Sequence, residues 1–330
     1  MNIRHLFFVV TGLLFGVSCS NDFDLTEGNV ELPVVYGLVS TTDTATYIRV
    51  ERAFVDENTS AYVLAKDPEK LYFPDIEVII RQDKNGIKTD YKFKRVDGNL
   101  EGYKRAEGAF ADAPNYLYKS KNSLNPILPD TKYTLLVKRA DGSTLTEGTT
   151  TSLNKYVNED IISPGTSALL SFGYKTQNKV EWVADPDAAI HDVNYIIHYK
   201  EDKNGVISNK SVTWKLVRNY EKTEYTFKGQ TFYEFMKGAI EADPQVKRYL
   251  QGASIELVSG GKEIRDYISI GQANLGITSS GEIPRYTNLS NGGLGLFSSK
   301  AYFRRDNIGF SNITIDSLRN GIFTKSLNFK

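Results

Sequence analysis

The stretch Leu128-Pro129-Asp130-Thr131-Lys132-Tyr133-Thr134-Leu135-Leu136-Val137 decides the fold class of this chain. A turn built on proline and aspartate leads into a segment in which every second residue is large and apolar. The side chains that share one side of that segment are Tyr133, Leu135 and Val137. Because side chains of a β-strand alternate between its two faces, this pattern predicts a strand with one face in a core.

The same stretch resembles the tyrosine corner of fibronectin type III domains. In that corner the tyrosine hydroxyl bonds back to the backbone near the preceding turn and pins a crossing between two sheets. The resemblance implies that Tyr133 is a structural residue. It also implies that the first domain is an immunoglobulin- or fibronectin III-like β-sandwich.

Further short β-rich runs flank this strand, and Gly, Pro, Asn and Asp residues separate them. In the first half they are 34–39, 46–50, 76–81 and 88–94, and in the second half they restart at 179–183 and 193–199. We therefore expect a mainly β protein with two β-sandwich-like domains, at 29–153 and 154–330, because one sandwich needs only about 100 residues.

The tetrapeptide Asp-Lys-Asn-Gly occurs twice, at 83–86 and 202–205, each time after a strand-like run. Asn-Gly between two β runs predicts a two-residue hairpin turn in which both central residues have positive φ. The repeat either marks two related sandwich modules or is a common hairpin solution used twice. The residues leave both readings open.

The second domain is expected to carry a short helical insertion at about 231–251. Thr231 and Glu234 have the spacing of a capping box, and apolar residues follow at helical intervals. Asp243-Pro244 then reads as the start of a second short helix that ends near Gly252.

The N-terminal residues predict a lipoprotein signal peptide over 1–18. Arg4 and His5 precede an apolar run from Leu6 to Val17, and small residues lead to the only cysteine, Cys19. A twelve-residue apolar run spans about 18 Å, which is too short for a permanent membrane helix. Cleavage before Cys19 would leave its thiol as the lipid attachment site, with palmitate-type acyl chains. The alternative is an ordinary secreted protein whose cysteine falls by chance in the cleavage region.

An acidic segment follows the cysteine, within an expected tether over 19–28: Ser20, Asn21, Asp22, Phe23 and Asp24. It resembles the signal that exports lipoproteins of Bacteroidota to the cell surface. The resemblance implies a protein anchored by lipid in the outer membrane and facing the exterior. The other reading is a solvated tether with no export role.

Composition excludes several functions. Forty Lys and Arg residues balance forty Asp and Glu residues, without a basic stripe, so a nucleic-acid partner is not expected. With Cys19 lipidated, the mature chain has no thiol nucleophile or thiolate metal ligand. Only His191 and His198 follow the signal, and no zinc or serine-hydrolase motif is present. We therefore expect no enzyme activity, no cofactor and no metal site. A glycoside hydrolase remains a remote alternative, because carboxylate pairs form only on folding.

Near the C-terminus, Tyr286-Thr287-Asn288 precedes the glycine-rich run Gly292-Gly293-Leu294-Gly295-Leu296-Phe297. The run lacks the lysine and the βαβ setting of a nucleotide loop. Together with Val35-Tyr36-Gly37-Leu38, Tyr47-Ile48-Arg49-Val50 and the acidic segment, it resembles a Bacteroidota family of surface-exposed outer-membrane lipoproteins of unassigned function. That resemblance offers no catalytic residues, and it implies work beside a partner in the outer membrane.

The sequence thus predicts a non-catalytic surface lipoprotein that acts as an accessory or scaffold subunit of an outer-membrane complex for transport, secretion or membrane assembly. The expected partner is an integral outer-membrane β-barrel protein. The alternative is a glycan- or nutrient-binding lipoprotein, since aromatic residues in loops serve either purpose. The candidate contact aromatics are Tyr62, Tyr72, Phe73, Tyr116 and Tyr118.

Overall fold

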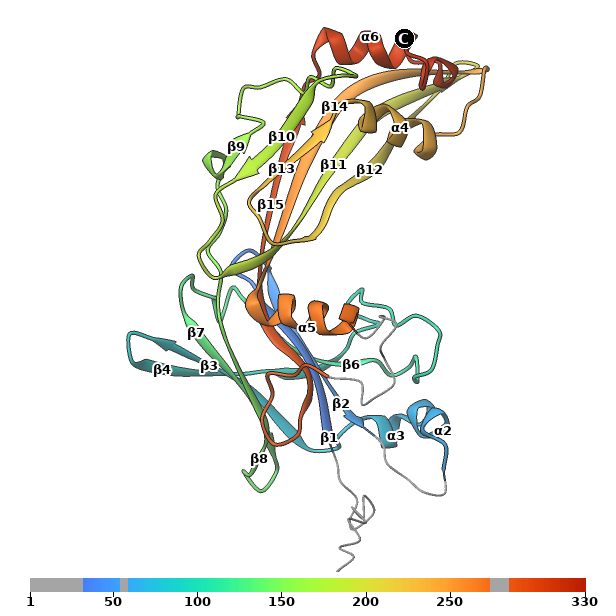
Figure 1. Ribbon diagram of the computed structural model, residues 1–330. Helices are drawn as coiled ribbons and strands as arrows, with labels where there is room; N and C mark the ends of the chain where they lie inside the picture. Colours follow the sequence, from blue (N-terminus) through green and yellow to red (C-terminus); the bar gives the residue numbers. More distant parts are fainter. Residues whose placement is uncertain (1–31, 54–58, 274–284) are drawn as a thin grey trace, which may run out of the picture.

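The structure, a computed structural model, describes residues 32–53, 59–273 and 285–330 (Figure 1). It is mainly β, with 49% of residues in strands and 16% in helices. Two lobes lie one above the other in Figure 1. We call them the first lobe, which holds β1 to β8, and the second lobe, which holds β9 to β14 with helices α4 and α6.

The first lobe is a sandwich of two sheets around a mainly aliphatic core. One sheet contains β1 (Leu32–Val39), β2 (Ala45–Ala53), β6 (Tyr116–Lys121) and β5 (Lys94–Asp97). The other contains β4 (Ile87–Lys92), β3 (Ile76–Lys84), β7 (Lys132–Arg139) and β8 (Thr144–Thr151). Short helices α2 (Ala61–Lys66) and α3 (Pro68–Leu71) follow β2.

Strand β7 shows the alternation that the sequence predicts. Tyr133, Leu135 and Val137 are completely buried and belong to the core of the first lobe. The hydroxyl of Tyr133 accepts a hydrogen bond of 2.8 Å from the backbone N–H of Leu128 and donates one of 3.1 Å to Gln82 Oε1. The bond to Leu128 is the one that the tyrosine-corner motif predicts, and it fastens the start of β7 to the preceding turn.

The second lobe combines the long strands of the eight-stranded sheet with a separate three-stranded sheet. The long strands are β11 (Ala188–Lys203), β12 (Val206–Tyr220) and β14 (Val246–Gly261). The smaller sheet contains β13 (Glu224–Lys228), β10 (Gln177–Trp182) and β9 (Ile161–Ser163). Helices α4 (Gln230–Ala239) and α6 (Asn312–Asn320) and the short helices η1 (Asn158–Asp160) and η2 (Lys325–Leu327) complete it. Its core is rich in aromatic rings.

Strand β15 (Leu294–Ile308) belongs to both lobes. Its first residues run parallel to β1, with Val34 opposite Leu294, and its later residues run antiparallel to β14. The result is one eight-stranded sheet in the order β12-β11-β14-β15-β1-β2-β6-β5. Residues 289 and 297, within the range expected for the second domain, therefore pack in the core of the first lobe.

The two Asp-Lys-Asn-Gly segments are hairpin turns, as predicted. Asn85 and Asn204 each have φ of 54°, and the glycines after them have φ of 83° and 84°. The turns join β3 to β4 and β11 to β12, with residue 84 opposite 87 and residue 203 opposite 206. Positive φ at both central residues is the geometry of a type I′ turn, whose twist matches that of the flanking strands.

The predicted helical insertion at 231–251 is wrong in its second part. Helix α4 ends at Ala239, and residues 246–251 belong to β14, where Val246 pairs with Lys203 of β11. Asp243 does not start a helix: its carboxylate accepts the backbone N–H of Gln245 and forms an ion pair with Lys203. Pairing with a long neighbouring strand overrides the short helical pattern.

The start of α4 also differs from the predicted capping box. The N-cap is Gly229, which has no side chain to cap the helix, and Thr231 donates its hydroxyl to the backbone oxygen of Lys228. Helix α5 (Lys262–Ala273), which continues directly from β14 and lies at the junction of the lobes, was not predicted.

Candidate functional site

The first candidate site involves the end of the first lobe at which β1 begins. Leu32 pairs with Ala53 at the end of β2, so β1 begins at the same end of the lobe as that from which helices α2 and α3 follow. The β5–β6 loop (98–115) starts and ends there, because β6 runs antiparallel to β2. It folds back over the sheet: the Arg105 guanidinium contacts Glu51 at 2.7 Å, and the Tyr103 ring centre lies 4.7 Å from that of Tyr47 near the start of β2. A backbone hydrogen bond of 2.8 Å from Ala111 to Ala65 joins this loop to α2.

Large apolar side chains are exposed on α2 and on this loop. We call this set the apolar end surface; its members, with their exposed fractions, are Tyr62 (60%), Val63 (59%), Leu100 (88%), Tyr103 (54%) and Phe110 (43%). Exposed apolar residues that gather in one region of a soluble domain commonly mark an interaction surface. The surface combines aromatic with aliphatic side chains.

Polar contacts hold the β5–β6 loop in place. Arg105 binds the buried Glu51 carboxylate and the Tyr72 hydroxyl, and its guanidinium lies 4.7 Å from the centre of the Phe110 ring. Burial by itself would lower the pKa of Arg105, but the hydrogen bond and charge of Glu51, together with Tyr72, outweigh it and raise that pKa. Asn115 Nδ2 donates to the backbone oxygen of Tyr103 at 2.7 Å. The loop therefore presents its apolar residues in a fixed arrangement.

Only part of the predicted contact aromatics lies on this surface. Tyr62 is exposed, whereas Tyr72, Phe73 and Tyr118 are buried and offer no ring to a partner. Tyr116 is half-buried, with the Arg95 guanidinium 4.7 Å from its ring centre. Tyr72 and Phe73 are covered because they lie at the end of α3, which packs against β2. Leu100, Tyr103 and Phe110 were not singled out, since they lie in no periodic segment.

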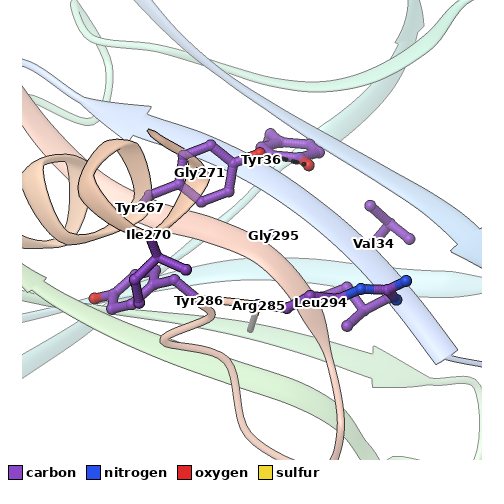
Figure 2. Close-up of a pocket in the computed structure, with 9 residues that line it drawn as sticks. All are labelled: Val34, Tyr36, Tyr267, Ile270, Gly271, Arg285, Tyr286, Leu294 and Gly295. Atoms are coloured by element: carbon purple, nitrogen blue, oxygen red, sulfur yellow. Dashed lines mark hydrogen bonds between the residues drawn. The ribbon is translucent and has the colours of Figure 1, made fainter. Parts of the chain in front are cut away.

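A second candidate site lies between α5 and the parallel pair β1 and β15. It is a cavity of about 300 Å³ lined by nine residues (Figure 2): Val34, Tyr36, Tyr267, Ile270, Gly271, Arg285, Tyr286, Leu294 and Gly295. Figure 2 shows Tyr36 and Tyr267 along one side and Arg285, Tyr286 and Leu294 along the other. We call it the α5 pocket.

Tyr36 and Tyr286 of the α5 pocket are held as neutral hydroxyls. Tyr36 and Tyr267 meet edge to face, with ring centres 6.3 Å apart and hydroxyl oxygens 3.4 Å apart. Burial and the hydrogen bond to Tyr267 raise the pKa of Tyr36 to about 12. Burial, followed by the charges of Glu263 and Asp266, raises the pKa of Tyr286 to about 12. At neutral pH these side chains can therefore donate as well as accept hydrogen bonds.

Gly295 allows the floor of this pocket to form. Its φ is +103°, and a Cβ atom there would lie 2.1 Å from the backbone oxygen of Val35. Only glycine permits this close approach of β15 to β1. The glycine-rich run thus serves a structural purpose at this position.

The Tyr-Thr-Asn motif beside it joins the two sheets of the first lobe. Asn288 Oδ1 accepts the backbone N–H of Phe297 at 3.0 Å, and its Nδ2 donates to the backbone oxygens of Phe297 and, at 3.2 Å, Thr149. Asn288 therefore ties β15 to β8, while the neighbouring Tyr286 faces the pocket. An outward-facing aromatic, Tyr36, between inward Val35 and Gly37 was the one sequence signal for this site.

Both histidines are engaged with serine hydroxyls. His191 is buried, with Nδ1 2.7 Å from Ser259 Oγ, and burial lowers its pKa to about 4. Nε2 of His198 lies 2.8 Å from Ser254 Oγ. Within 32–53, 59–273 and 285–330, no group of three or more His, Cys, Asp or Glu side chains could hold a metal ion.

Cys19 and the segment Ser20 to Asp24 lie outside the described residues, so lipidation and export stay predictions. In the part of the chain that the structure describes, no helix has the length and apolar character to cross a bilayer.

Comparison with known proteins gives weak likenesses to solved structures. No family model matches the chain, and no curated protein matches it in sequence. A structure of the chicken CNTN1 FN1-FN3 domains aligns at 12% identity and a TM-score of 0.25, covering 70% of this chain and 62% of that one. The C-terminal globular domain of an oligosaccharyltransferase from Pyrococcus abyssi aligns at 10% identity and a TM-score of 0.23, covering 69% and 47%. The chain thus spans less than two thirds of either structure.

Proposed function

We propose that this protein is a non-catalytic, lipid-anchored outer-membrane protein of the cell surface that acts as an accessory or scaffold subunit for an integral β-barrel partner. The observation that carries the proposal is the apolar end surface, whose α2 residues Tyr62 and Val63 lie at the end of the first lobe where β1 begins. An anchored protein with an apolar surface next to its anchor point is suited to contact a protein embedded in the same membrane.

The length of the tether supports this arrangement. Thirteen peptide steps separate Cys19 from Leu32, and a fully extended chain spans at most about 3.5 Å per residue, or about 45 Å. A lipid on Cys19 would hold Leu32, where β1 begins, within that distance of the bilayer. Confinement to the membrane plane raises the effective concentration near an integral partner, so a modest interface suffices.

The composition of the surface favours a protein partner over a sugar. Leu100 and Val63 are among its most exposed members, and aliphatic side chains offer no flat ring on which a sugar can stack. The loop is held by Arg105 and Asn115 before any partner arrives. Such a preformed surface loses little conformational entropy on binding.

The test is a pull-down of the tagged full-length protein from gently solubilised outer membrane, comparing wild type with Leu100→Glu. The matched control is Ile87→Glu, an equally aliphatic position that is 73% exposed on the β3–β4 hairpin, away from the surface. We expect wild type and the control to recover an integral membrane protein in stoichiometric amount, and Leu100→Glu to recover at least about tenfold less.

Recovery of the lipoprotein alone from wild type would overturn the accessory-subunit proposal. Equal recovery by Leu100→Glu and wild type would show that the partner binds elsewhere. A Cys19→Ala variant tests the anchor in the same preparation: the proposal requires it to leave the membrane fraction.

A further inference from the structure

The α5 pocket brings together three segments that are distant in sequence. Tyr36 comes from β1, Tyr267 and Ile270 from α5, and Tyr286 and Arg285 from the segment before β15. Together they form an apolar, tyrosine-lined wall around one cavity with a guanidinium beside it (Figure 2). No other part of the proposed function uses these residues.

The charge of Arg285 is not compensated within the described residues. Its side chain is exposed, and no described carboxylate lies within ion-pair distance of it. The acidic residues near the pocket have other partners. Asp266 binds Arg265 at 2.7 Å, and Glu263 accepts the hydroxyls of Ser298 and Thr150.

Glu51, the remaining carboxylate that acts on Tyr36, is bound by both Arg49 and Arg105. Among the described residues, the pocket therefore presents one available positive charge next to an apolar wall. A ligand that satisfies both features carries an anionic group on a ring with apolar faces.

The size of the cavity suits a small ligand of a single ring. Its volume of about 300 Å³ is at the lower end of the roughly 300–1,000 Å³ found for ligand pockets. The hydroxyls of Tyr36 and Tyr267 lie 3.4 Å apart at one side of the cavity, and a hydroxyl pair has donor and acceptor capacity left for ring hydroxyl groups. An inorganic anion would use Arg285 and leave the apolar wall empty, whereas a neutral sugar would leave Arg285 unpaired.

We propose that the α5 pocket binds one acidic sugar residue, a uronic acid, with its carboxylate on Arg285 and its ring against the tyrosines of α5 and β1. The site shares no residue with the apolar end surface. Its failure would therefore leave the scaffold proposal standing, and the reverse also holds.

The test measures binding of methyl glucuronide to the detergent-solubilised full-length protein by titration calorimetry, with methyl glucoside and inorganic phosphate as matched probes. We expect methyl glucuronide to bind with a Kd of about 1 mM or tighter. Both matched probes should bind at least about tenfold more weakly, since each satisfies only one feature of the pocket.

Two variants locate the site. Arg285→Gln should weaken methyl glucuronide binding at least about tenfold while leaving the thermal unfolding midpoint unchanged, because the residue is exposed. Arg319→Gln, an exposed arginine on α6, is the control and should bind like wild type. Absence of methyl glucuronide binding at about 10 mM, equal binding of phosphate, or full binding by Arg285→Gln would each overturn the proposal.

Discussion

Both lobes are β-sandwiches, but their cores contain different kinds of side chain. The second lobe closes with helices and a cluster of aromatic rings, in which Phe172 alone contacts Tyr195, Trp214, Phe227, Phe232 and Phe310. The first lobe has a mainly aliphatic core and uses polar links, among them Tyr133 and Asn288.

The lobes also differ in what they need from the rest of the chain. All strands of the second lobe except part of β15 lie between residues 161 and 261. The core of the first lobe also contains residues 289 and 297, which lie more than a hundred positions after the end of β8. The stability of the first lobe therefore depends on residues from the C-terminal third of the chain.

The largest effect is expected from Gly295→Val. A Cβ at this position meets the backbone oxygen of Val35 at 2.1 Å, and valine does not tolerate the positive φ. The pairing of β1 with β15 should break, which lowers the free energy of unfolding by about 4 kcal/mol. The measurement is urea unfolding followed by circular dichroism for the whole chain and by tryptophan fluorescence for the second lobe, since both tryptophans, Trp182 and Trp214, belong to its core.

If the lobes unfold independently, the tryptophan transition of Gly295→Val will coincide with that of wild type, and the shared-strand interpretation fails. Gly238→Ala is the matched control. It lies in α4, where an added Cβ meets nothing within 4 Å, and should be neutral or stabilising by up to about 1 kcal/mol.

Acidification should weaken the second lobe by an intermediate amount through His191. Burial lowers the pKa of His191 from 6.5 to about 4, so between these pH values the unfolded chain binds a proton that the folded chain does not. Stability therefore falls as the pH drops below 6.5, by about 2 kcal/mol at pH 5. Tryptophan-detected urea unfolding at pH 7 and pH 5 measures this loss.

His191→Asn supplies the comparison, because asparagine has no proton to gain and its amide can still bond to Ser259. The variant should lose about 2 kcal/mol less than wild type between the two pH values. An identical pH dependence in both proteins would mean that other groups cause the acid sensitivity.

The smallest effect is expected from Tyr133→Phe in the first lobe. The backbone N–H of Leu128 and the amide oxygen of Gln82 each lose a partner, which should cost about 1.5 kcal/mol. Circular dichroism during urea unfolding measures the change. Tyr91→Phe removes a 3.2 Å hydrogen bond to the same Gln82 from a half-buried ring and should cost under about 0.5 kcal/mol. Equal effects of the two variants would contradict the corner role of Tyr133.

Local patterns in the sequence determined a large part of this molecule. The alternation in β7, the two Asn-Gly turns and the bond of Tyr133 all depend on residues within a few positions of one another. Mainly β structure and the first turns of α4 follow from the same short-range periodicities. Steric preferences of the backbone and the spacing of apolar side chains act over this range, so the sequence alone suffices there.

The tertiary structure decided what depends on distant pairing. Residues 246–251 have a helical pattern but lie in β14, because β11 offers a long row of hydrogen-bonding partners. The contacts between distant segments also decide three other features. They are the pairing of β15 with β1 of the first lobe, the burial of Tyr72 and Phe73, and the exposure of Leu100. The α5 pocket unites residues 36, 267 and 286, which no local pattern connects. Burial and exposure depend on neighbours that folding alone brings together, and that is why the surfaces proposed to carry function emerged only from the fold.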